Sequence, residues 1–573
     1  MILGKITAKV GDSNPQIFRE LKERLTLRNM GIAVAATLII QGFVLLYFNN
    51  QIPIPAYDDT SIAGASSHKL IETHSKYCPV ATFPNDNEYS NPVALCSLNK
   101  DGTFRISWQN WRSDVFICLS WTLPLGLILG SVYMLVADLV REEKRGTLNF
   151  IRLSPQSARN IFIGKILGVP ILVYLAVVLA IPLHLWVGFS AGATMTLFAS
   201  WYLTIGSIWC LLSSAAVLYA LLGGVQAIVT VIAVAFPICL PLTVINAFLS
   251  GTINHEKWLN KESEHLSWFG LTINSSAIWF YAFGTGCCLI ASYWVWQALQ
   301  RRYLNPTATV IGKSQSYLVN LCFQLWIAGF TIPLIFADPA KYVSTRQAVT
   351  GFAIVDFMAL LLLIPMLLPS KQAIQAWSRY RRERVTHQQR KFWQRELIQD
   401  WIGNDKSPAL LTIAINVGMA MIFWIPVSML ALTAPTQGMT FNDFSTPGHG
   451  IRLLACVCFA ASLILIYAAI AHLGLFLKVR KHNLWTVAIL SIAIFLPLVA
   501  AFALSPVRTP TGLAAIVLLF SPFAPIGIMS LAEGSILAAF TAQLVVFTAL
   551  THQLQRKLRT AGQSQSKELL AHN

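Results

Sequence analysis

The sequence predicts an all-α polytopic membrane protein with about twelve transmembrane helices in two six-helix halves. Of its 573 residues, 55% are hydrophobic and only 12% are charged, whereas about a quarter of the residues in a typical soluble domain are charged. The mean hydropathy is +0.59. Apolar runs of about 18 residues or more recur along the chain, and each is long enough to cross a ~30 Å hydrocarbon core as a helix. The composition therefore excludes an ordinary soluble domain.

The apolar runs place the predicted spans in order. One stretch, 511–531, is interrupted by Ser521-Pro522 and Pro525, and because proline disrupts a continuous helix we expect a re-entrant or interfacial element there. Full crossings are expected at 29–49, 115–137, 161–187, 194–221, 225–250, 274–298, 318–336, 350–368, 409–433, 451–477, 485–503 and 533–552.

The positive charges predict the orientation of these spans. The formal net charge is +17, and roughly three quarters of the Lys and Arg residues lie on one side if the N-terminus is cytoplasmic. We therefore expect a multi-pass protein of the plasma (inner) membrane with both termini in the cytoplasm, and no nucleic-acid partner. The principal cytoplasmic segments would be an amphipathic helix at 1–28, an elbow at 138–165, a linker at 301–317, a segment at 369–408 and a tail at 553–573.

The largest external segment is expected at 50–113. It contains Cys78 and Cys96, the two cysteines that lie in a predicted external loop. If that side of the membrane is oxidising, a disulfide between them is plausible, and two unpaired thiols are the alternative. The other cysteines lie in or near spans, and their scatter gives no spacing typical of a metal site.

A constant offset suggests that the half at 29–300 is repeated at 318–552. Glu143 lies eleven positions before Ser154-Pro155, and Glu396 lies eleven positions before Ser407-Pro408, which is a shift of 253. Internal duplication is common in transporters. A competing register aligns Arg19-Glu20 with residues 395–396, and a chance alignment of two helical bundles is a further alternative.

The elbow carries the most distinctive motif. A charged helix end is followed by a Gly-Thr break, a short apolar run and a Ser-Pro turn that can restart a helix, and the motif continues to Gly164-Lys165. An ordinary cytoplasmic loop is the alternative interpretation. The residues that we expect to act in this segment are Glu142, Glu143, Lys144, Arg145, Gly146, Thr147, Leu148, Ser154 and Pro155.

This run resembles the cytoplasmic signature of type-2 ABC transporter (ABC-2) permeases, in which a Glu-Lys-Arg-x-Gly-Thr-Leu-like pattern leads to Leu-Ser-Pro and Gly-Lys. Residues 14–21 are similar to the amphipathic N-terminal helix of that family. The resemblance covers the first half well, but the second half retains only Glu396 and Ser407-Pro408.

The resemblance implies an exporter-type transmembrane subunit without catalysis of its own, which docks a separate ABC ATPase. The elbow would transmit motion with support from Arg19 and Glu20, while Glu396, Ser407 and Pro408 would form a degenerate second docking surface. ATP and Mg would bind to the ATPase, and this chain would hold no cofactor. Apolar helix surfaces favour an amphipathic or lipid-like substrate, but no residue selects one, and the transport unit could contain one copy or two.

The chain has no room for the ATPase itself, because a nucleotide-binding domain needs roughly 200 soluble residues and no gap between spans approaches that length. Gly312-Lys313-Ser314 has the end of a phosphate-binding loop. It lacks the first glycine of that motif and a strand–loop–helix context, so we interpret it as an ordinary loop.

Ionisable residues inside predicted spans leave two other functions open. Asp356, Glu533 and His184 are candidates, because such groups are costly in a membrane and are often functional. Hydrogen bonding to neighbouring helices is the alternative role. An ion-coupled carrier with twelve helices would use paired intramembrane charges, whereas a membrane-embedded glycosyltransferase-like enzyme would use Asp58 and Asp59 in the external loop.

Overall fold

The computed structural model describes residues 14–53, 76–78, 104–223, 226–253, 266–335, 342–384, 402–403, 405–433, 449–477, 482–504 and 512–561. Within these residues the chain is almost entirely helical, with one two-stranded hairpin. It forms two compact units, which are described separately below. Unit 1 comprises residues 1–265 and 273–303, and unit 2 comprises residues 266–272 and 304–573.

The prediction of an all-α polytopic membrane protein is confirmed. Among the described residues, ten helices are long and apolar enough to cross a membrane, and up to twelve if each of two bent helix pairs counts as one span. Several of these helices leave their apolar side chains exposed: the hydrophobic windows of Leu27–Asn49 and Trp485–Leu504 are only 11% and 6% buried. Such surfaces need a lipid environment or further protein to cover them.

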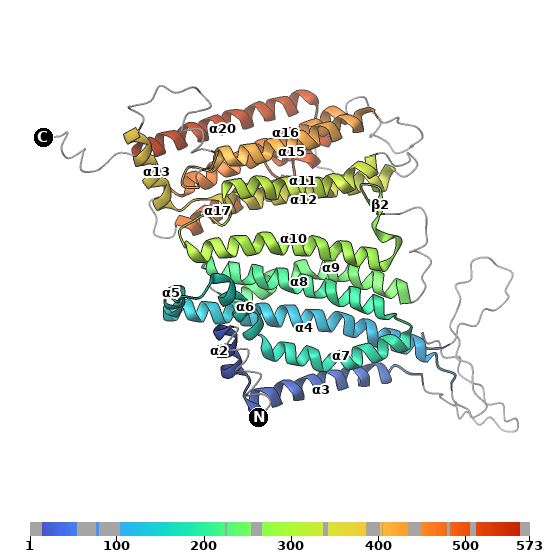
Figure 1. The fold of residues 1–573 in the computed structure, drawn as a ribbon. Helices are drawn as coiled ribbons and strands as arrows, with labels where there is room; N and C mark the ends of the chain where they lie inside the picture. The colour runs from blue at the N-terminus through green and yellow to red at the C-terminus, as the bar shows by residue number, and fades with distance from the viewer. Residues whose placement is uncertain are drawn as a thin grey trace, which may run out of the picture. The chain divides into compact units, whose positions relative to one another are not determined.

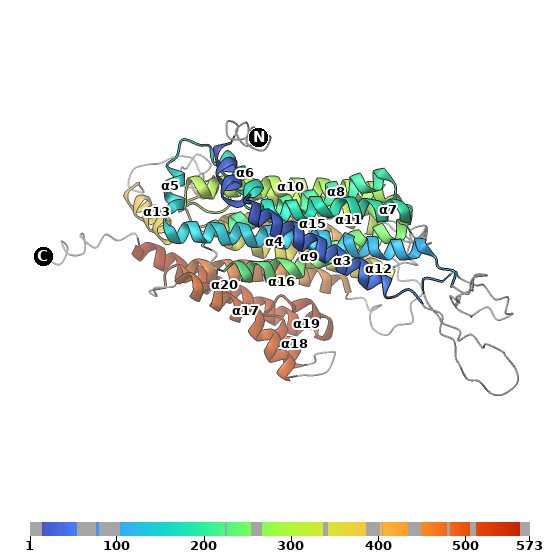
Figure 2. The same cartoon turned by 90° about the horizontal axis from the view of Figure 1, so that it is seen from below.

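Unit 1 is built around its longest helix, α4 (Trp108–Arg145), which packs against four other spans (Figures 1 and 2). Val132, Leu135, Val136 and Leu139 are fully or almost fully buried on α4, and their spacing of three and four residues places them on one helix face. The spans of unit 1 are α3 (Leu27–Asn49), α4, α7 (Ile171–Ala191), α8 (Met195–Leu221), α9 (Ala227–Ile253) and α10 (Ala277–Leu304).

Three shorter helices gather at one end of unit 1: α2 (Pro15–Arg24), α5 (Thr147–Arg152) and α6 (Ala158–Gly168) (Figures 1 and 2). The predicted span at 161–187 is wrong at its start, since α6 is a separate helix and α7 begins only at Ile171. Pro170 accounts for this break, because proline lacks an N–H and disfavours helix in the residue before it.

Unit 2 is centred on α16 (His449–Gly474), which packs against α12, α15, α17 and α20. A hairpin pairs Ser267 with Thr272 and docks on α11 through a bond from the Phe269 N–H to the Gly329 carbonyl (2.8 Å). The helices and strands are β1 (Ser267–Trp268), β2 (Leu271–Thr272), α11 (Lys313–Ile335), α12 (Tyr342–Leu367), α13 (Lys371–Arg384), α15 (Leu410–Thr433), α16, α17 (His482–Leu504) and α20 (Glu533–Ala561).

The interrupted stretch at 511–531 forms two short helices, α18 (Leu513–Leu518) and α19 (Ala524–Ser530), and neither is long enough to cross a membrane. Gln543 on α20 donates to the carbonyl of Leu519 between them (2.8 Å) and also bonds to Ser462 on α16. The buried amide thus supplies a partner to backbone that lies outside regular helix.

The predicted shift of 253 matches three helices of each unit. It carries α8, α9 and α10 onto 448–474, 480–506 and 530–557, and α16, α17 and α20 lie within a few residues of these positions. The helices in the first part of each unit do not correspond under this shift. α4 is one continuous helix of 38 residues, whereas Gly351–Leu367 and Lys371–Tyr380 form a pair bent by 70°.

Candidate functional site

The elbow begins where α4 ends. Gly146 has a positive φ of 73°, and its N–H bonds to the Glu143 carbonyl at 3.0 Å. A left-handed residue after a helix is favourable for glycine because it has no Cβ. The hydroxyl of Thr147 then donates to the Glu142 carbonyl (3.1 Å), so α5 starts directly after the turn.

We predict that Gly146→Ala destabilises this turn by about 1 kcal/mol, since an L-residue is strained in the left-handed region. Faster hydrogen exchange of the α5 amides would report the effect. Gly126→Ala is the matched control, because Gly126 lies within α4 and a Cβ there meets nothing within 4 Å. Equal exchange in the two variants would contradict the prediction.

Helix α5 and the residue that follows it divide their apolar side chains between two faces. Leu148 and Ile151 are buried, whereas Phe150 and Leu153 are 78% and 85% exposed. Thr147–Arg152 lies next to the charged last turn of α4, which includes Lys144 and Arg145. The end of unit 1 therefore presents exposed apolar side chains beside basic ones.

The N-terminal helix α2 packs closely against α6. The side chain of Asn14 caps α2 by accepting from the N–H groups of Gln16 and Ile17, and its amide donates to the Asn160 carbonyl (2.8 Å). Gly164 and Gly168 leave room for the approach: a Cβ on either would lie 2.6 Å from the Cβ of a side chain on α2. α2 is thus seated on a glycine face of α6.

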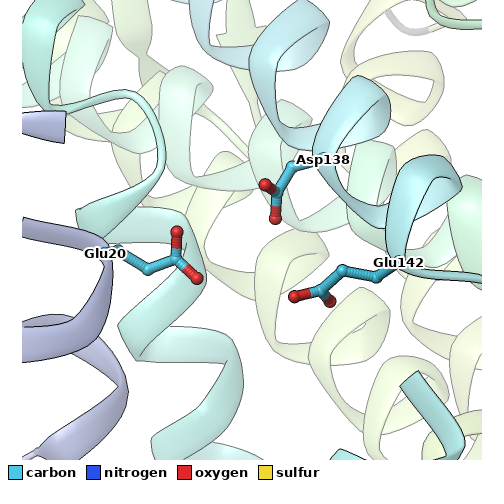
Figure 3. A group of neighbouring side chains, drawn as sticks. All are labelled: Glu20, Asp138 and Glu142. Atoms are coloured by element: carbon cyan, nitrogen blue, oxygen red, sulfur yellow. The ribbon is translucent and has the colours of Figure 1, made fainter. Parts of the chain in front are cut away.

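A buried lysine lies at the centre of this junction. The ammonium of Lys165 on α6 lies 2.8 Å from Asp138 Oδ2 and 2.9 Å from Glu142 Oε2, both on α4, and 3.6 Å from Glu20 Oε1 on α2. Figure 3 shows the three carboxylates from α2 and α4 facing a common space. Burial alone would lower the pKa of Lys165, but the three carboxylates outweigh it and the pKa is raised. The lysine is therefore held as a cation.

Two arginines on α2 complete the network. Arg19 bonds to Glu20 (3.2 Å) and Glu142 (3.1 Å), while Arg24 bonds to Glu20 (3.3 Å) and Asp138 (2.6 Å). Three cationic side chains thus pair with three carboxylates, and together these residues come from the three helices α2, α4 and α6. We call these six residues the junction cluster: Arg19, Glu20, Arg24, Asp138, Glu142 and Lys165.

The three carboxylates of the junction cluster are suitable ligands for a metal ion, but the ammonium of Lys165 contacts all of them. Oxygens of Glu20, Asp138 and Glu142 lie within 4.8 Å of one another, and carboxylate oxygens suit hard cations. Because the Lys165 ammonium contacts all three groups, the protein satisfies this donor set with a side chain. The arrangement can fasten α2 to α4 and α6, and it offers no free coordination position.

The structure separates the other residues predicted at the elbow. Glu143, Lys144 and Arg145 are exposed, and none of these three described residues takes part in the ion pairs of the junction cluster. The expectation that Ser154-Pro155 restarts the next helix is wrong by one turn: Ser157 caps α6, and its hydroxyl accepts from the Asn160 N–H (3.3 Å).

In unit 2, Ser407 and Pro408 are buried. The Lys313 ammonium donates to the Ser407 hydroxyl and to the Pro408 carbonyl (3.4 Å). Lys313 therefore points into the protein at the start of α11.

The candidate intramembrane residues have different surroundings. His184 is fully buried and bonds to Ser120 (2.9 Å) and Tyr202 (2.7 Å), which fits an interior residue held by neighbouring helices. Glu533 is exposed in the first turn of α20, where a helix N-terminus favours a negative charge. Asp356 is buried among α11, α12 and α15.

Some predicted residues lie outside the part of the chain that the structure describes: Glu396, Cys96, Asp58 and Asp59. Cys78 is buried and disulfide-bonded, while its pairing with Cys96 remains a prediction.

Sequence reasoning missed Asp138 and Arg24, and it placed Lys165 in the Gly-Lys pair at the end of the elbow motif without assigning it a partner. One signal was available: Gly164 and Gly168 have the spacing of small residues that lets two helices approach closely. The ion pairs that join different helices in the junction cluster connect residues 23 to 145 positions apart and have no local signature.

The fold and the junction cluster define a multi-pass helical membrane protein with an anchored N-terminal helix at one end of its first unit. Comparisons with protein families, curated proteins and solved structures give no match to this chain.

Proposed function

We propose that the chain is the transmembrane permease subunit of an ABC-type exporter and works with a separate ATPase subunit. The observation that carries this proposal is the elbow, where a short helix presents Phe150 and Leu153 outward beside Lys144 and Arg145. Exposed apolar side chains at the polar end of a bundle favour a protein partner. The resemblance of this segment to ABC-2 permeases supports an ATPase as that partner.

The junction cluster gives such a contact a mechanical consequence. α5 follows α4 directly, and α4 packs against four further spans. A displacement of α5 would move α4, and through Glu20 and Lys165 it would also move α2 and α6. In this proposal the ATPase lies in the cytoplasm, so the elbow and the N-terminus of this plasma-membrane protein face the cytoplasm.

The proposed docking surface is confined to unit 1. Ser407 and Pro408, the corresponding pair in the second half, are covered by protein and would have to be uncovered before they could contact a partner. We propose substrate movement along the spans, with an amphipathic or lipid-like cargo.

The test is affinity purification of the full chain from native membranes in mild detergent, followed by mass spectrometry. We predict that an ABC ATPase subunit co-purifies with the wild type and is at least tenfold depleted with Phe150→Asp/Leu153→Asp, because two apolar anchors cost roughly 1–2 kcal/mol each. Asn149→Asp is the matched control: it adds a charge to α5 without removing apolar surface, and it is expected to retain the ATPase. A chain that purifies without any ATPase would contradict the proposal.

A further inference from the structure

Unit 2 contains a ladder of polar side chains that the proposed function does not use. Lys313, Ser316, Asn320 and Gln324 are all buried on α11, and their spacing of three and four residues places them on one helix face. The ladder leads from the start of α11 to Asp356 on α12, 11 positions along α11 or roughly 16 Å.

Hydrogen bonds make this ladder continuous. The side-chain amide of Asn416 on α15 donates to the Ser316 hydroxyl (3.2 Å), and the backbone carbonyl of Asn416 accepts from the side-chain amide of Asn320 (2.9 Å). The Gln324 amide donates both to Asn320 Oδ1 (3.3 Å) and to Asp356 Oδ1 (2.6 Å). Polar side chains thus follow one another from the end of unit 2 into its apolar core.

Asp356 is surrounded by neutral groups. It is 2% exposed, and its second oxygen accepts from Trp424 Nε1 (2.7 Å). Two neutral donors stabilise a carboxylate, but they do not cancel its charge, and an uncompensated charge in a membrane interior is costly. A bound proton would remove that cost.

Within the described part of the chain, Asp356 forms no ion pair, and its side-chain partners are Gln324 and Trp424. Among the described residues, α15 has no ionisable residue, while Lys313 and His472 bond to residues 407–409 at the end of the unit. The ionisable residues on the helices packed against α12 are Lys313, Tyr317 and Cys322 on α11, and His449, Arg452, Cys456, Cys458, Tyr467 and His472 on α16.

Two acceptors along the ladder lack a partner within the described structure: Gln324 Oε1 and Asn416 Oδ1, on side chains that are 6% and 0% exposed. A buried acceptor costs free energy unless a donor reaches it, and water molecules usually fill this role. The bond between the Ala409 N–H and His472 (2.9 Å) sets the register of α15 and α16. Counted from this bond, the backbone of Tyr467 lies within about one turn of the level of Asn416, and the hydroxyl of Tyr467 also lacks a partner within the described structure.

We propose that Asp356 is a proton-binding site, reached from the start of α11 by a file of water molecules along this ladder. A hydronium at the inner end of the file transfers its proton to a carboxylate oxygen and leaves a neutral water, and the reverse step releases the proton. This site is independent of the proposed ATPase contact, since it lies wholly within unit 2.

The test is infrared spectroscopy of the full chain in lipid nanodiscs, with D2O as the probe. The carbonyl band of a protonated carboxylic acid should be present in the wild type, absent in Asp356→Asn and shifted in Asp356→Glu. If Asp356→Asn does not fold, the Asp356→Glu comparison decides. A spectrum without such a band, or with one that neither variant alters, overturns the proposal.

A second arm tests the water file. Asn416→Leu replaces a ladder amide with an apolar group and is expected to slow deuteration of the Asp356 carboxyl by roughly tenfold. Asn246→Leu is the matched control, because Asn246 in unit 1 is also buried and also has an unpartnered Oδ1. Equal exchange rates in these two variants would overturn the water file.

Discussion

Replacement of Lys165 by methionine should produce the largest loss of stability. The substitution keeps the length of the side chain but removes the ammonium that faces Asp138, Glu142 and Glu20. Breaking a buried ion pair by removing one partner costs about 3–5 kcal/mol, because the remaining charges are left uncompensated. Thermal unfolding of the purified protein should show a clearly lower Tm, and α2 should become sensitive to protease.

Lys144→Met is the matched control, since it removes the same charge from an exposed position. The pH dependence gives a second check. Because the folded-state pKa of Lys165 is raised above 10.5, its contribution is complete below that value and is lost as the pH rises through the folded-state pKa. Equal Tm values for the two methionine variants at neutral pH would contradict the assigned role of Lys165.

The double substitution Gly164→Ala/Gly168→Ala should separate α2 from α6. Each new Cβ would lie 2.6 Å from a Cβ of α2, on Gln16 and Glu20 respectively. Such overpacking costs about 1–3 kcal/mol per site, which exceeds the gain of ~1 kcal/mol from placing alanine in a helix. The displacement of α2 would also lengthen the Glu20–Lys165 contact.

Hydrogen exchange of the α2 amides measures this effect directly, and we expect loss of their protection. Gly206→Ala in α8 is the control, because a Cβ there meets nothing within 4 Å. Retained α2 protection in the double variant would mean that α2 does not depend on close packing against α6.

The sequence was sufficient for those features that depend on local composition. Long apolar runs located the spans, and the prolines at 522 and 525 separated α18 from α19. The break between α6 and α7 was missed, because Gly164-Lys165-Ile166 stands in an apolar run and Pro170 was read as part of a helix. In the sequence alone, a lysine that flanks a span at the membrane boundary looks the same as a lysine that forms a buried ion pair.

The candidate site was predicted in part. The resemblance to ABC-2 permeases indicated Arg19, Glu20 and Glu142. Asp138 and Lys165 complete the ion-pair network, and only the three-dimensional structure shows that they belong to it. The same holds in unit 2, where the sequence indicated Asp356 as a costly intramembrane acid. Its partners Gln324 and Trp424 lie 32 and 68 positions away on other helices, so no local pattern could pair them.

The central claim is that the exposed face of α5 contacts an ATPase, and a photoreactive amino acid at position 150 tests it most directly. The full chain, expressed in its native membrane and irradiated there, should cross-link from position 150 to an ABC ATPase subunit. The same probe at position 148, where Leu148 is buried, should give no such product. Cross-links from position 150 only to lipid, or to no partner, would contradict the account.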